Sequence, residues 1–134
     1  MTSGHDSRWI LAAGALLIAA ATVLGALGAH ALQSRLSPER LQVYDTAVRY
    51  HFYHALGLLA IGLAARTVDS GWLRSSAILI VVGIVLFSGS LYALTFGAPR
   101  VVGMITPVGG VALIIGWLVF AAAVLRGPLL RGPH

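Results

Sequence analysis

The chain has 134 residues, of which 58% are hydrophobic and 10% are charged, so too few polar side chains exist to cover a soluble globule of this size. All nine basic residues are arginines and the formal net charge is +5, but they form no dense basic run, so nucleic acid is not an expected partner. Cysteine is absent, which excludes a disulfide framework, a thiol nucleophile and a thiolate metal site.

Four apolar stretches occupy most of the sequence, and each is close to the ~20 residues that a membrane-crossing helix needs. They are residues 9–29, 48–65, 73–96 and 103–125. We therefore predict a single all-α domain over residues 1–134, an integral membrane protein built as an antiparallel four-helix bundle.

The first stretch follows a polar leader. Ala29-His30-Ala31 has the form of a signal-peptide cleavage site, but the apolar run before it is longer than a usual signal core, so we expect an uncleaved helix. Gly25 and Gly89 lie in two series of small residues spaced four apart, in the first and third stretches. Such series predict close contacts between helices and would also permit a homo-oligomer.

The tripeptide Ser37-Pro38-Glu39 predicts a helix start, with a capping hydroxyl, a proline in the first turn and an acid near the positive end of the dipole. A continuous helix over residues 38–65 would be about 42 Å long, which exceeds the ~30 Å hydrocarbon core. Its first turns then form a short interfacial extension before the second span. Asp45 and Arg49 stand four residues apart there, which predicts an ion pair on the helix surface.

The loop at residues 66–72 is short, so the second and third helices should be antiparallel neighbours. Gly97-Ala98-Pro99 is expected to end the third helix. The fourth helix has two alternative beginnings. It starts at the capping pair Thr106-Pro107, or it starts near Gly103 and kinks at the proline.

Four spans place both ends of the chain on one side of the membrane. Five arginines flank that side, namely Arg8, Arg66, Arg74, Arg126 and Arg131, and four flank the other, namely Arg35, Arg40, Arg49 and Arg100. By the positive-inside rule this bias of five against four places both termini in the cytoplasm of a bacterial plasma membrane.

The most function-like signal is a set of polar residues placed toward the side that carries the first and third loops. The set comprises His30, Tyr50, His54, Ser88, Tyr92 and Thr106. Polar groups in lipid need partners, so we expect them to converge, either as a structural hydrogen-bond network or as a small polar pocket. Arg49 and Arg100 at the same interface would supply charge for an anionic lipid head group.

Metal binding and catalysis are weaker interpretations. His30, His51 and His54 could in principle hold zinc, copper or haem iron. No carboxylate shares their stretch at ligand spacing, and lone histidines more often serve as hydrogen-bonded polar residues, so we expect no metal and no cofactor. No acid lies at depth to orient a base, so a catalytic triad and an enzymatic role are not expected.

Five short motifs run in order along the chain between about Ala12 and Arg126. They are residues 25–30 (GALGAH), 50–54 (YHFYH), 86–92 (LFSGSLY), 106–110 (TPVGG) and 116–117 (GW). Together they resemble the signatures of the domain of unknown function 423 family, which includes YgdD-like bacterial membrane proteins and eukaryotic transmembrane protein 256. The resemblance extends to His30, Tyr50, His54, Ser88, Ser90, Tyr92, Thr106 and Pro107, whereas His51 departs from the family pattern. It implies a small multispan membrane protein and supplies no reaction or cofactor.

The sequence thus predicts a small membrane protein whose polar half recognises lipid head groups or a small partner, with membrane lipids as its partners. The second hypothesis is a small oligomeric transporter or channel subunit. His54 would then be the coupling group, because no Asp, Glu or Lys lies within a predicted span. A haem- or metal-binding membrane protein is the third hypothesis.

Overall fold

Four long α-helices follow one another along the chain in the computed structural model, which describes residues 3–127. They are α1 (Ser3–Leu27), α2 (Pro38–Ala64), α3 (Gly71–Thr95) and α4 (Ile105–Arg126). A π-helical turn, η1 (Gly28–Leu32), extends α1, and a 3-10 turn, η2 (Arg100–Met104), leads into α4. The prediction of an all-helical chain is confirmed, since residues 3–127 form no β-strand. Arg131 lies outside the described residues.

Three helical stretches are long and apolar enough to cross a membrane. They are Gly4–Leu32, Gly71–Thr95 and Arg100–Arg126. The predicted second span, residues 48–65 within α2, is not one of them. Its first half carries an arginine, two tyrosines and two histidines in close succession, and these side chains lower its mean hydropathy.

The start of α2 matches the prediction from Ser37-Pro38-Glu39. The Ser37 hydroxyl accepts a hydrogen bond from the Arg40 amide at 3.3 Å, and Pro38 occupies the first turn, where its missing N–H group does no harm. The helix then continues without a break to Ala64. The predicted surface ion pair also forms, with Arg49 Nη2 2.5 Å from Asp45 Oδ2.

The third helix ends before Gly97-Ala98-Pro99, as predicted, and the structure shows that its end is a Schellman turn. The Ala98 amide donates to the Ala93 carbonyl at 3.0 Å, and the Gly97 amide donates to the Leu94 carbonyl at 3.2 Å. Gly97 has a φ of 99°, a backbone conformation that favours glycine.

The start of α4 lies between its two predicted beginnings, one near Gly103 and the other a cap at Thr106-Pro107. The turn η2 precedes the helix, α4 begins at Ile105, and Thr106 is already its second residue. The Thr106 hydroxyl instead lies 2.6 Å from the Ser90 hydroxyl on α3. A tertiary hydrogen bond therefore takes the place of the predicted local cap.

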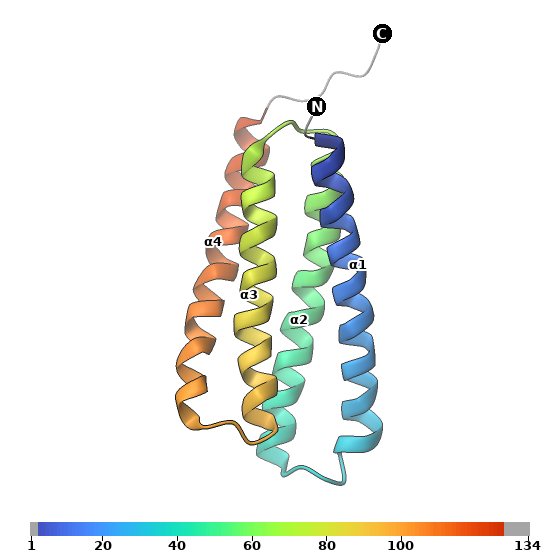
Figure 1. Cartoon of the computed structure of the whole chain (residues 1–134), viewed down its shortest axis with the longest axis vertical. Coiled ribbons are helices and arrows are strands. Elements are labelled where there is room, and N and C mark those ends of the chain that lie inside the picture. Colours follow the sequence, from blue (N-terminus) through green and yellow to red (C-terminus); the bar gives the residue numbers. More distant parts are fainter. Residues whose placement is uncertain (1–2, 128–134) are drawn as a thin grey trace.

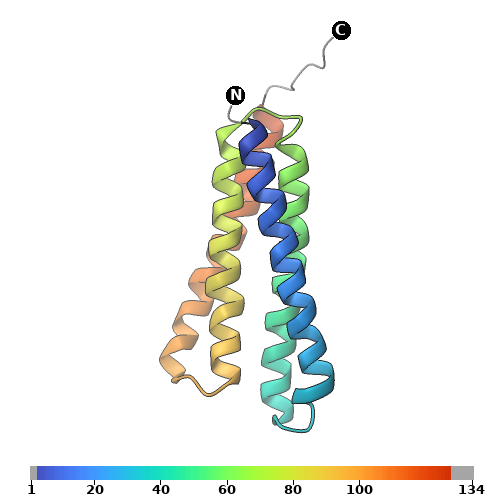
Figure 2. The ribbon, with the colours of Figure 1, turned by 45° about the vertical axis from the view of Figure 1, so that its right-hand side comes forward.

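The helices lie side by side, with consecutive helices in contact, as Figure 1 shows. Extensive contacts join α1 to α2, α2 to α3 and α3 to α4, whereas α1 touches α3 only slightly. We call the end at which α1 begins and α4 ends the termini face, and the opposite end the loop-one face. The pairs α1–α2 and α3–α4 draw apart toward the loop-one face (Figure 2).

Glycines allow the closest contacts between helices. Gly25 and Gly89, the two glycines predicted from the four-residue spacing, are not at these contacts. A Cβ atom on Gly89 would meet nothing within 4 Å, and one on Gly25 would lie 3.4 Å from Val48 Cγ1, an ordinary contact. The prediction of a close seam within the chain at Gly89 is therefore wrong. At Gly83 and Gly109, between α3 and α4, an added Cβ would collide with the neighbouring helix.

Candidate functional site

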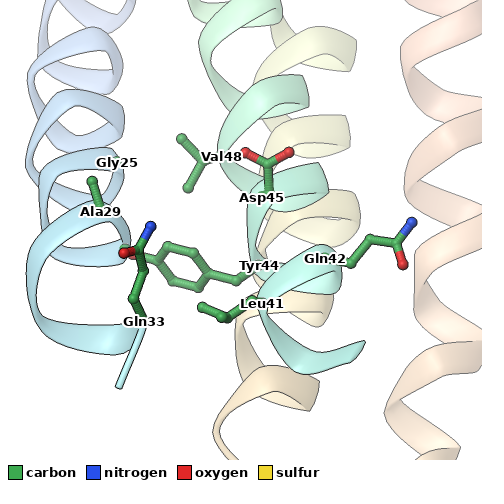
Figure 3. Close-up of a pocket in the computed structure, with 9 residues that line it drawn as sticks. Gly25, Ala29, Gln33, Leu41, Gln42, Tyr44, Asp45 and Val48 are labelled. Atoms are coloured by element: carbon green, nitrogen blue, oxygen red, sulfur yellow. The ribbon is translucent and has the colours of Figure 1, made fainter. Parts of the chain in front are cut away.

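An open groove at the loop-one face separates the end of α1 from the first turns of α2 (Figure 3). Its volume is about 400 Å³, within the range of small-molecule pockets. Nine residues line it: Gly25, Gly28, Ala29, Gln33, Leu41, Gln42, Tyr44, Asp45 and Val48. We call it the α1–α2 groove. None of the six polar residues predicted as a binding cluster lines it.

The floor of the α1–α2 groove is apolar because α1 presents small residues and α2 presents larger ones. Leu41, Tyr44 and Val48 extend from α2 toward the glycine-rich end of α1 (Figure 3). Gly28 is required here, since a Cβ atom on it would lie 2.6 Å from Cε1 of the Tyr44 ring. The π-helical turn η1 starts at this same residue and forms the end of α1 beside the groove.

The rim of the groove is polar. Gln33 follows η1 directly, and Asp45 is an exposed residue about two turns from the start of α2. Arg49 is bound to Asp45, so a carboxylate and a guanidinium stand side by side at the rim, both more than half exposed. An apolar floor beneath a polar, zwitterionic rim suits a molecule that has an apolar part and a charged head.

Tyr44 links this groove to the interior. Its hydroxyl donates to the Leu24 carbonyl on α1, and its ring centroid lies 5.5 Å from that of Tyr92 on α3. Tyr92 in turn shares a 3.0 Å hydrogen bond with Nδ1 of His51. The three aromatic side chains connect α1, α2 and α3.

Among residues 3–127, His51 is the one buried histidine, with 4% of its surface exposed. Its Nε2 atom has no hydrogen-bond partner within the described residues, although the Leu17 backbone of α1 lies beside it. From the sequence, the only role predicted for His51 is that of a weak metal ligand. A signal was present, because Tyr44, His51, Leu58 and Ala65 repeat every seven residues and all are buried.

Two of the predicted polar residues, Ser88 and Tyr92, do face α2 together. The Ser88 hydroxyl donates to the Ala47 carbonyl at 2.8 Å, one helical turn from the bond between Tyr92 and His51. Thr106 lies apart from them and bonds Ser90, which itself donates to the Phe87 carbonyl at 2.9 Å. These contacts join α2 to α3 and α3 to α4.

The other predicted residues point elsewhere. His30 is exposed on η1. His54 bonds the Tyr50 carbonyl of its own helix at 2.7 Å, and its ring stacks on that of Tyr50, with centroids 5.9 Å apart. Tyr50 is 42% exposed, and Arg100 is exposed at the start of η2. The structure therefore does not bring His30, His54, Tyr92 and Thr106 into one cluster.

The geometry bears on the metal hypothesis as well. Within residues 3–127, no three side chains from the set His, Asp and Glu gather closely enough to hold a metal ion. His51 and His54 stand three residues apart, but one is buried against Tyr92 and the other lies beside Tyr50 and Trp117. Their imidazoles serve two different contacts.

Known relatives match most of this chain. The family described as "Protein of unknown function (DUF423)" matches residues 24–110. A UPF0382 membrane protein of Staphylococcus epidermidis is 45% identical over 118 residues, covering 84% of this chain and 92% of its own. The UPF0382 membrane protein YwdK of Bacillus subtilis is 44% identical over 114 residues, covering 84% and 93% of the two chains.

The similarity extends to a protein of the Gram-negative inner membrane. The UPF0382 inner membrane protein YgdD of Escherichia coli is 33% identical over 120 residues, covering 90% of this chain and 92% of its own. No solved structure matches the chain. The three apolar helices agree with the membrane designation of these relatives. The chain therefore belongs to the DUF423 family, a family of membrane proteins of unknown function.

Proposed function

We propose that all four helices cross the membrane as an antiparallel bundle, with α2 as the fourth span. Three stretches are apolar enough on their own, yet α1 begins and α4 ends at the same face, which requires an even number of crossings (Figure 1). α2 is long enough, about 40 Å, and packs on both α1 and α3. Its polar residues are partly shielded by those neighbours, and both termini lie in the cytoplasm.

The function that the geometry supports best is recognition of a membrane lipid by the α1–α2 groove. The observation that carries it is the apolar floor beneath the exposed pair of Asp45 and Arg49. An acyl chain would lie along Leu41 and Val48. The lipid phosphate would bind Arg49, and an ammonium on the same head group would bind Asp45.

A test of this proposal uses the purified protein in nanodiscs, with lipid retention measured by native mass spectrometry. Gly25→Leu places a large side chain into the groove, where a Cβ atom still finds room, and Arg49→Gln removes the phosphate ligand. Each variant is expected to lose bound phospholipid, about fivefold for Arg49→Gln. Gly89→Leu is the matched control, because it enlarges a glycine with open space around it and away from the groove.

The proposal is wrong if Gly25→Leu and Arg49→Gln retain as much phospholipid as the unchanged protein. Equal loss from the Gly89→Leu control would also contradict it, because the loss would then follow from any enlargement of a glycine. The thermal unfolding of each variant is also measured in detergent, and a cooperative transition shows that the variant is folded.

Transport is the second candidate function. One observation favours His51 over His54 as the residue that would couple transport to proton movement. Within residues 3–127, His51 is buried and its Nε2 atom has no hydrogen-bond partner, whereas Nδ1 of His54 is bonded to the Tyr50 carbonyl of its own helix. If the protein moves protons or a solute, flux into proteoliposomes should fall in His51→Gln and persist in His54→Gln. Absence of flux in the unchanged protein would remove this candidate and leave lipid recognition standing.

A further inference from the structure

A second groove lies at the termini face, which is the end of the molecule opposite the α1–α2 groove. It has a volume of about 350 Å³ and is lined by Gly4, Ser7, Arg8, Leu11 and Arg66. Arg8 comes from the second turn of α1, and Arg66 lies in the turn after α2, two residues beyond its last residue Ala64. Two arginines from separate segments of the chain therefore border one cavity.

The two arginines have no acidic partner within residues 3–127. The ion pairs found there are those of Arg49 with Asp45 and of Arg74 with Asp6, at 4.0 Å in the second case. Asp6 stands between the lining residues Gly4 and Ser7 in α1 but does not line the groove, and it contacts Arg74 and the indole N–H of Trp9. Two positive charges that share a cavity without a carboxylate favour an anion between them.

The remaining lining residues complete an amphipathic site. Gly4 lies in the first turn of α1, where backbone N–H groups have no intrahelical acceptor, and no atom would meet a Cβ on it within 4 Å. Ser7 is held by a 3.1 Å hydrogen bond from its hydroxyl to the Gly4 carbonyl. Leu11 lies one helical turn beyond Arg8 and packs on Gly62 of α2. The groove therefore has an apolar surface next to its two arginines.

We propose that this groove, which we call the Arg8–Arg66 groove, binds the phosphate of an anionic membrane lipid in the leaflet at the termini face. The guanidinium groups take the phosphate oxygens, and the acyl chain continues past Leu11 toward the bilayer interior. A free phosphate ion has the same oxygens, but the apolar surface at Leu11 favours the lipid. The site lies at the face opposite the α1–α2 groove, so it does not depend on the function proposed above.

In the experiment the full chain is reconstituted into nanodiscs that contain either phosphatidylglycerol or phosphatidylcholine, and the lipid that stays bound to the protein is read by native mass spectrometry. Arg8→Gln and Arg66→Gln are each expected to reduce phosphatidylglycerol occupancy about fivefold, and more when combined. Arg126→Gln is the matched control. It removes the same charge near the same face, but Arg126 lies 6.0 Å from the Trp72 ring centroid and does not line the groove.

Arg8→Lys and Arg66→Lys keep the charge and should retain most of the preference for phosphatidylglycerol. In a second arm, inorganic phosphate is titrated into the detergent-solubilised protein. Phosphate alone should show no saturable binding, because it lacks the acyl chain that contacts Leu11. The proposal is overturned if Arg126→Gln lowers occupancy as much as Arg8→Gln. It is also overturned if phosphatidylglycerol shows no advantage over phosphatidylcholine, or if inorganic phosphate binds as well as the lipid.

Discussion

Gly109→Ala should unfold in detergent at a markedly lower temperature than the unchanged protein. A Cβ atom on Gly109 would lie 2.8 Å from the Leu86 carbonyl carbon and from the Phe87 Cα atom, and would come still closer to the Phe87 amide nitrogen. These are backbone atoms of α3, so no side chain can rotate away and the two helices must separate. We expect a destabilisation of about 3 kcal/mol, which exceeds the ~1 kcal/mol gained in helix propensity.

The matched control is Gly89→Ala. Gly89 lies in the same helix that Gly109 touches, but nothing lies within 4 Å of an added Cβ atom. This variant should unfold at the same temperature as the unchanged protein or slightly above it, because alanine is the better helix former. Equal stability of Gly109→Ala and Gly89→Ala would contradict the close packing of α3 on α4.

Tyr92→Ala should destabilise the protein by a similar amount, about 3 kcal/mol, because it leaves a cavity among three helices. The Tyr92 ring contacts Tyr44 and its hydroxyl bonds His51, so its loss removes the link between the groove wall and the buried histidine. Tyr92→Phe keeps the ring and deletes the hydroxyl, and should cost about 1 kcal/mol.

The difference between these two variants separates packing from hydrogen bonding. Thermal unfolding in detergent measures both, and Phe96→Ala serves as a control because that ring is 58% exposed although it also meets Tyr44. If Tyr92→Phe proves as damaging as Tyr92→Ala, the hydrogen bond to His51 outweighs the ring, and the packing argument fails.

Features fixed by neighbouring residues were predictable from the sequence. The start of α2 at Ser37-Pro38, the end of α3 at Gly97 and the pair of Asp45 with Arg49 all depend on backbone or side-chain contacts within five residues. The all-helical class follows from the apolar stretches. The start of α4 falls between two predicted alternatives, and the sequence did not decide between them because the partner of Thr106 is Ser90 on α3.

The arrangement of the candidate site depends on how each helix is rotated about its axis, and the spacing of residues in the sequence does not determine that rotation. His51 and His54 differ by only three positions, yet one faces Tyr92 and the other stacks on Tyr50. The small-residue spacing was ambiguous for the same reason, since Gly89 and Gly83 lie on different sides of α3. The α1–α2 groove arises from residues on two helices and carries no motif of its own.

The succession of contacts along the chain has a consequence for how the protein is assembled. Each helix packs chiefly against the helix made just before it, α2 on α1, α3 on α2 and α4 on α3. A helix leaving the ribosome therefore meets a partner already present in the bilayer, and only a short loop must close to bring them together. Contacts this local favour rapid folding during synthesis, with the α1–α2 hairpin complete before the rest of the chain has been translated.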